Sequence, residues 1–71
     1  MTPLRRADMT DKQYDDLVQT LADKVTPGND TLIKSIDVIT EYTREKGIRY
    51  SHTTWQNLRW DVYARAKEDA S

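Results

Sequence analysis

The chain has 71 residues, which allows one small domain with a limited apolar core. It contains no cysteine, which excludes disulfide scaffolds, zinc sites with thiolate ligands and cysteine nucleophiles. Charged residues make up 32% of the chain, yet 11 Lys/Arg and 12 Asp/Glu nearly cancel to a net charge of −1, whereas a dedicated DNA-binding domain is more often strongly basic.

The charges are unevenly distributed along the chain. Residues 1–30 hold four Lys/Arg and six Asp/Glu, whereas residues 31–67 hold seven Lys/Arg and four Asp/Glu. The second part is therefore the one that favours a nucleic-acid partner. No apolar run follows Arg5 and Arg6, and no segment approaches the roughly 18 apolar residues of a membrane span. We therefore expect a cytoplasmic protein.

The first predicted helix begins after Thr10. Thr10 and Gln13 have the spacing of a capping box, and Met9 and Tyr14 have the spacing of a hydrophobic staple around it. Apolar residues then recur at positions 14, 17, 18, 21, 22 and 25, which is the spacing of one helix face. The pair Pro27-Gly28 is expected to end this helix.

The second predicted helix is capped by Asn29 or Asp30. Its apolar residues cover well over half of the helix circumference: Leu32, Ile33, Ile36, Val38, Ile39 and Tyr42. A stripe of this width predicts contacts on two sides, so we expect this helix to be central. Gly47 is expected to end it in the left-handed conformation, with Ile48 folding back onto Tyr42.

The third predicted helix begins near Ser51 and runs to about Lys67. With Ser51 as the cap, Tyr50 and Trp55 occupy the staple positions, while Thr53 with Gln56 is an alternative capping box. Its inner stripe consists of Trp55, Leu58, Val62 and Ala66, with Tyr63 on the flank.

Residues 47–58 resemble the second half of a helix-turn-helix motif. The matching positions are, in order, a turn glycine, an apolar residue, a serine cap, a threonine, a core position, two polar residues and a second core position: Gly47, Ile48, Ser51, Thr54, Trp55, Gln56, Asn57 and Leu58. Arg49 and Tyr50 make the turn two residues longer than in the compact motif. Within residues 32–67, the resemblance implies that the third helix enters the major groove of double-stranded DNA.

The resemblance also implies a set of DNA contacts. Thr53, Gln56 and Asn57 would face the bases, because Asn and Gln can bond adenine bidentately. Four cations would neutralise phosphates. With Trp60, the candidate interface is Lys46, Arg49, Thr53, Gln56, Asn57, Arg59, Trp60 and Lys67. The alternative interpretation of the polar residues is an ordinary solvated helix face.

Trp60 has two interpretations. It lies about 140° from Trp55 around the helix, so it cannot share the inner stripe. Either it is buried against the N-terminal arm or the loop between the first two helices, or it is an exposed anchor for a partner. In the second case Trp60 and Tyr63 would form the surface of a protein-protein adaptor or inhibitor, or a homodimer contact.

The remaining polar residues predict no catalytic chemistry. His52 is the only histidine, with no second ligand or nucleophile arrangement around it, and is expected to be a surface residue. The carboxylates at positions 37, 41 and 45 are expected to form a solvated ridge, and those at positions 11, 15 and 16 suit a helix N-terminus. We therefore expect no enzyme, no metal and no cofactor.

The sequence as a whole predicts an all-α fold. We expect a flexible N-terminal arm over residues 1–9 and a small three-helix bundle over residues 10–68, with a helix-turn-helix-like second and third helix and the first helix packed across them. The favoured function is a small DNA-binding or transcription-regulatory module that acts as a homodimer. The alternative is the protein-binding adaptor.

Overall fold

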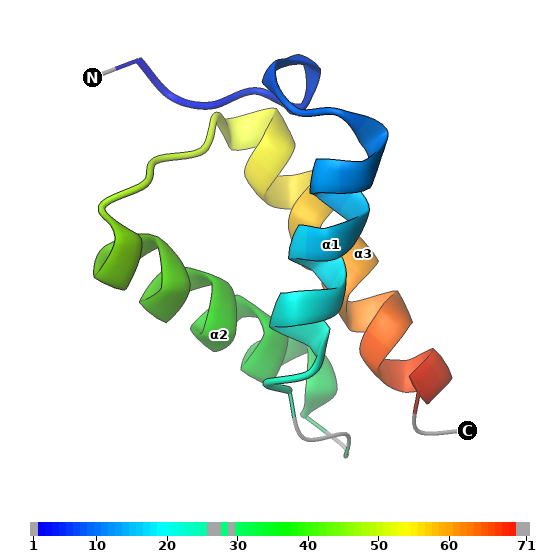
Figure 1. Ribbon diagram of the computed structural model, residues 1–71. Coiled ribbons are helices and arrows are strands. Elements are labelled where there is room, and N and C mark those ends of the chain that lie inside the picture. The colour runs from blue at the N-terminus through cyan, green and yellow to red at the C-terminus, as the bar shows by residue number, and fades with distance from the viewer. Residues whose placement is uncertain (1, 26–27, 29, 70–71) are drawn as a thin grey trace.

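The computed structural model describes residues 2–25, 28 and 30–69, and this part of the chain is helical (Figure 1). It contains a short 3-10 turn, η1 (Arg6–Asp8), and three α-helices, α1 (Asp11–Ala22), α2 (Thr31–Lys46) and α3 (His52–Asp69). The helices pack together as a small bundle. The predicted all-α, three-helix architecture is confirmed.

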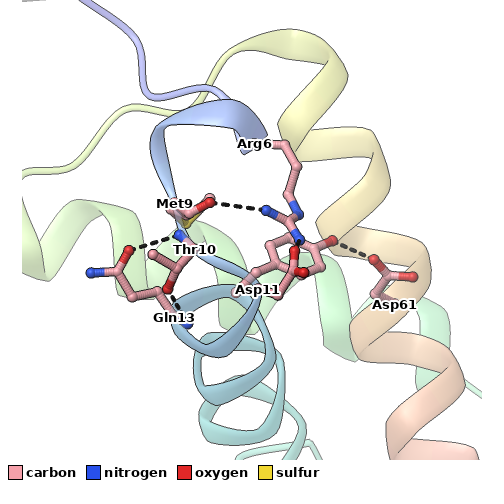
Figure 2. Close-up of polar contacts among 7 residues, drawn as sticks. Arg6, Met9, Thr10, Asp11, Gln13 and Asp61 are labelled. Carbon is pink, nitrogen blue, oxygen red and sulfur yellow. Dashed lines mark hydrogen bonds and ion pairs between the residues drawn. The ribbon is translucent and has the colours of Figure 1, made fainter.

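The N-terminus of α1 carries the predicted capping box. The Thr10 hydroxyl accepts from the Gln13 amide at 3.1 Å, and the Gln13 side-chain oxygen accepts from the Thr10 amide at 2.9 Å (Figure 2). Met9 and Tyr14, the predicted staple pair, are both half-buried against the core. These reciprocal bonds satisfy backbone donors that an uncapped helix leaves without a partner.

The helix α1 ends at Ala22, earlier than the sequence predicts. The Lys24 and Val25 amides donate to the carbonyls of Leu21 and Ala22, three residues back, at 3.1 and 3.0 Å. The chain thus tightens into turns, although the Val25 side chain remains buried in the core. The predicted stop at Pro27 lies outside the described residues.

The helix α2 begins after Asp30, one of the two predicted cap residues, but the Asp30 side chain does not hold this end of the helix. Asp30 occupies the cap position, but its side chain makes no capping hydrogen bond, and Asn29 lies outside the described residues. The buried Thr31 hydroxyl accepts from the Gly28 amide at 2.9 Å and lies 2.6 Å from the Gly28 carbonyl, to which it donates. Thr31, the first residue of α2, therefore stabilises the preceding turn through its hydroxyl.

The turn between α2 and α3 follows the prediction closely. Gly47 has φ 65°, in the left-handed region, and the Ile48 amide donates to the Thr43 carbonyl at 3.0 Å. The Thr54 amide donates to Ser51 Oγ at 3.3 Å, so Ser51 is the cap of α3. The alternative cap at Thr53 is wrong, because Thr53 already lies inside the helix.

The core lies on the inner side of α3, which packs extensively against both other helices. The largest fully buried apolar side chains are Leu21 from α1, Ile39 from α2, and Leu58 and Val62 from α3. The prediction that the second helix is central is therefore wrong. One member of its broad apolar stripe, Ile33, is 62% exposed, so the stripe is wider than the surface that α2 buries.

The N-terminal segment has defined contacts that its lack of periodicity did not indicate. The Leu4 amide donates to the Arg49 carbonyl at 2.7 Å, and the Ser51 amide donates to the Leu4 carbonyl at 2.8 Å, which forms a parallel bridge opposite Tyr50. The Arg6 amide donates to the buried Thr54 hydroxyl at 2.9 Å. These bonds use backbone groups, which every sequence possesses and no side-chain pattern reveals.

Candidate nucleic-acid interface

The side of α3 that faces away from the core is exposed along the length of the helix. Because Leu58, Val62 and Ala66 are buried against α1 and α2, the opposite arc is left to solvent. The exposed residues of this arc are His52, Thr53, Gln56, Asn57, Trp60, Ala64 and Lys67. Asp61 and Glu68, which are also exposed, border the arc on the side of α1, next to Ala64. The arc is thus a continuous surface that neither neighbouring helix covers.

The candidate DNA contacts predicted from the sequence are accessible. Arg59 is half-buried, and the other predicted residues are exposed: Lys46, Arg49, Thr53, Gln56, Asn57, Trp60 and Lys67. Trp60 is 51% exposed, so neither the N-terminal segment nor the described part of the loop between α1 and α2 buries it. The interpretation of Trp60 as a buried residue is therefore wrong, and its role as an anchor for a partner stays a prediction.

Two aromatic rings and two cations lie along one stretch of α3, which we call the aromatic–cation strip (Arg59, Trp60, Tyr63 and Lys67). The Trp60 and Tyr63 rings meet edge to face, with centroids 6.0 Å apart and planes at 74°. The Arg59 guanidinium carbon lies 5.3 Å from the Trp60 centroid, and Lys67 Nζ lies 5.2 Å from the Tyr63 centroid. Each ring is therefore within cation–π distance of a positive charge.

The charge of Arg59 is not neutralised within the described part of the chain. No carboxylate among the described residues forms an ion pair with it, and its Nε is buried without a hydrogen-bond partner there. A guanidinium held over an indole ring in this way retains donors for an anionic ligand.

Two further cations precede α3. Lys46 ends α2 and Arg49 lies in the turn, and both side chains are exposed. Neither forms an ion pair with any carboxylate in the described ranges. By contrast, the cations of the N-terminal segment and the first turn of α1 are paired with nearby aspartates, as in Arg6–Asp11 at 2.8 Å.

The predicted base-reading residues occupy the first two turns of α3. The Gln56 amide nitrogen and the His52 Nε2 lie 3.0 Å apart and form a hydrogen bond along the helix. The side chains of Thr53 and Asn57 form no hydrogen bond with any described residue. Thr53 and Asn57 are therefore available for an outside partner, whereas Gln56 must exchange its bond with His52.

Two acidic residues of α3, Asp61 and Glu68, lie on another side of the helix, toward α1. The Tyr14 hydroxyl donates to the Asp61 carboxylate. Asp61 and Glu68 line a groove of about 330 Å³ between α1 and α3, which Asp11 and Asp15 border from the α1 side. Asp61 and Glu68 therefore lie on the α1 side of the exposed surface of α3, and the aromatic–cation strip lies on its other side.

The surroundings of Tyr14 include a contact that the sequence did not indicate. The Arg6 guanidinium lies 4.3 Å from the Tyr14 ring centroid, pairs with Asp11 and donates to the Met9 carbonyl at 3.1 Å (Figure 2). Burial raises the pKa of Tyr14 above its ordinary value, and the hydrogen bond with Asp61 raises this pKa further. No spacing rule connects Arg6, Tyr14 and Asp61, because they meet only through the packing of α1 on α3.

The other carboxylate candidates lie apart from this surface. Asp37, Glu41 and Glu45 are exposed on α2, as expected for a solvated ridge. Within the described ranges, no three His, Cys, Asp or Glu side chains are grouped closely enough to hold a metal ion. In the same part of the chain, no helix has both the length and the apolar character required to cross a bilayer.

Comparison of the chain with family models, with curated proteins and with solved structures finds no match in any of the three.

Proposed function

We propose that this protein is a non-enzymatic DNA-binding module that uses α3 as a recognition helix in the major groove of duplex DNA. The observation that carries the proposal is the division of the α3 surface. Its outward arc bears cations, amides and aromatic rings, while Asp61 and Glu68 lie toward α1. A ligand with a dense negative charge therefore meets attraction on the outward arc, despite the net charge of −1.

Phosphate binding follows from the unneutralised cations. Lys46 and Arg49 precede the first turn of α3, and Arg59 lies further along the helix. Contacts of this kind release counterions from DNA, so they contribute affinity that falls as the salt concentration rises. They position the helix on the duplex without reading its sequence.

Base recognition is assigned to the first two turns of α3. The N-terminal part of a recognition helix is the part that approaches base edges. Thr53, Gln56 and Asn57 lie there with exposed side chains. Gln56 and Asn57 each carry an amide that can pair bidentately with adenine. We assign the module to transcriptional regulation, acting as a homodimer on two half-sites.

The test is a titration of labelled duplex DNA at two salt concentrations, combined with measurement of the oligomeric state. The double variant Lys46→Ala/Arg49→Ala should weaken binding to all sequences and lower the salt slope by about two. The matched control is Lys12→Ala, which removes a cation that α1 pairs with Asp16 at 3.4 Å and should leave the slope unchanged. An unchanged slope in the double variant would count against these phosphate contacts.

A second candidate function is a protein-binding adaptor, and the 51% exposure of Trp60 favours it. Exposed tryptophans are enriched among the residues that dominate protein interfaces. In that case Trp60→Ala should abolish capture of the partner while the helical fold persists. Salt-dependent duplex binding that depends on Lys46 and Arg49 separates the first function from the second.

A further inference from the structure

We propose that the aromatic–cation strip binds unpaired bases of single-stranded DNA, with Trp60 as the stacking surface. This inference rests on the proposed DNA-binding function of α3 and adds a second form of DNA to it. A duplex buries the faces of its bases within the helical stack, so among DNA ligands an exposed indole face can stack only on a base that is unpaired.

The geometry of the Trp60 and Tyr63 rings gives them different roles in binding. Trp60 is 51% exposed, whereas Tyr63 is half-buried beside it. Because the ring planes lie at 74° to each other, the two rings cannot stack on the same base. Trp60 therefore offers the stacking face, and the edge-to-face contact with Tyr63 holds the indole in position.

The flanking cations supply the charge that a nucleic-acid backbone requires. Arg59 lies against Trp60 and Lys67 lies against Tyr63, eight residues further along α3, which spans about 12 Å of helix axis. Aromatic rings between cations are the arrangement that binds single strands without sequence preference. An acidic peptide would be attracted by the positive charge of the strip but has no planar base to place on Trp60, so the rings favour the nucleic acid.

The experiment measures tryptophan fluorescence during titration with a 12-residue thymidine oligonucleotide. The parallel ligands are a duplex of the same length, an abasic oligonucleotide with the same phosphates, and a polyglutamate peptide. The expected result is quenching of Trp60 by the thymidine strand and weaker binding of the abasic strand. Trp60→Phe keeps the half-buried Trp55 as the remaining reporter, so quenching should largely disappear in this variant while binding is retained.

Trp60→Ala should weaken binding of the thymidine strand about 5- to 150-fold, because stacking on one aromatic side chain contributes that much. The control is Lys12→Ala, which leaves the strip intact. Circular dichroism verifies that the Trp60→Ala variant keeps the helical fold, as the exposure of Trp60 leads us to expect. Equal affinity of wild type and Trp60→Ala overturns the inference, as does equal affinity for the abasic strand or for polyglutamate.

The outcomes also separate this inference from the proposed function. Binding of the duplex without quenching by the thymidine strand overturns the stacking inference and leaves duplex recognition standing. Binding of the thymidine strand through Trp60, without binding of the duplex, supports stacking and rejects the major-groove proposal. Failure to bind either ligand rejects both.

Discussion

The hydroxyl of Tyr14 on α1 donates to the carboxylate of Asp61 on α3, 47 residues further along the chain. A second polar link runs along the same side, where Arg65 binds the Asp15 carboxylate at 2.9 Å and the Gln19 side-chain oxygen at 2.7 Å. These polar contacts lie at the edge of the interface between α1 and α3, whose interior is apolar. They join the side of α3 that carries Asp61 and Arg65 to α1.

The raised pKa of Tyr14 predicts that stability falls in alkali. The folded state holds the phenol proton more tightly than the unfolded chain, whose tyrosine titrates near 10.0. The contribution of Tyr14 to the free energy of unfolding is therefore fully present below pH 10 and is lost as the pH rises above it. Burial also raises the pKa of Tyr50, which acts in the same direction.

Tyr14→Phe should make this alkaline loss shallower and should lower stability near pH 7 by about 1 kcal/mol, because the hydrogen bond to Asp61 is removed. Urea unfolding between pH 7 and 11 measures both effects. The Tyr50 share of the alkaline effect should remain in this variant. An identical pH slope in wild type and Tyr14→Phe would contradict the assignment.

Thr54 is expected to be required for docking of the N-terminal segment. Its hydroxyl accepts from the Arg6 amide at 2.9 Å and lies 2.7 Å from Ser51 Oγ, in a side chain only 2% exposed. Thr54→Val keeps the volume but leaves the Arg6 amide without its acceptor, at a cost of about 1–3 kcal/mol. Thr54→Ser should recover most of this stability in thermal unfolding, since it restores the hydroxyl. Equal stability of the valine and serine variants would show that the hydroxyl is not needed.

Gly47→Ala should destabilise the protein through the backbone alone. The residue has φ 65°, and an added Cβ would meet no atom within 4 Å, so the cost of about 1–2 kcal/mol comes from the left-handed conformation. Gly47→Asn should cost less, because asparagine tolerates this conformation better. Gly28→Ala is the control, since Gly28 has no positive φ and its Cβ would make an ordinary contact with Asp30 at 3.6 Å. Denaturant midpoints compare the three variants, and equal destabilisation at both glycines would refute the backbone explanation.

Truncation of Leu58 should destabilise the protein far more than truncation of Ile33. Leu58 is fully buried between the helices, so Leu58→Ala removes core volume and should cost about 2–5 kcal/mol, enough to unfold much of a domain of this size. Ile33 is 62% exposed, so Ile33→Ala should change stability by less than about 0.5 kcal/mol. Circular dichroism during urea unfolding measures both. A large destabilisation at Ile33 would show that α2 buries this face in the folded protein.

Sequence preference should reside in the amide pair of α3. The double variant Gln56→Ala/Asn57→Ala should bind adenine-containing sites with less preference over other sequences. Each bidentate amide–adenine pair that is lost should reduce this preference by about 1–3 kcal/mol. The salt slope should stay the same, because neither side chain is charged. Competition between duplexes of different sequence measures the preference. Unchanged preference would remove these two residues from base recognition.

The sequence by itself determined the helices, most of their ends and the polar composition of the outward arc of α3. The Thr10 capping box, the left-handed Gly47 and the Ser51 cap depend on residues within a few positions of each other, so local spacing is sufficient to predict them. The same holds for the buried stripe of Leu58, Val62 and Ala66, which follows the helical period.

Only the tertiary structure decided which helix is central, how the N-terminal segment docks and which neighbouring helix Asp61 and Glu68 face. The exposure of Ile33 and Trp60 depends on which surfaces the other helices cover. The Leu4 bridge uses backbone groups, and the Tyr14–Asp61 contact joins residues far apart in the chain. Such contacts depend on how whole helices are placed relative to one another. The hydrophobic period of a single helix does not predict this placement.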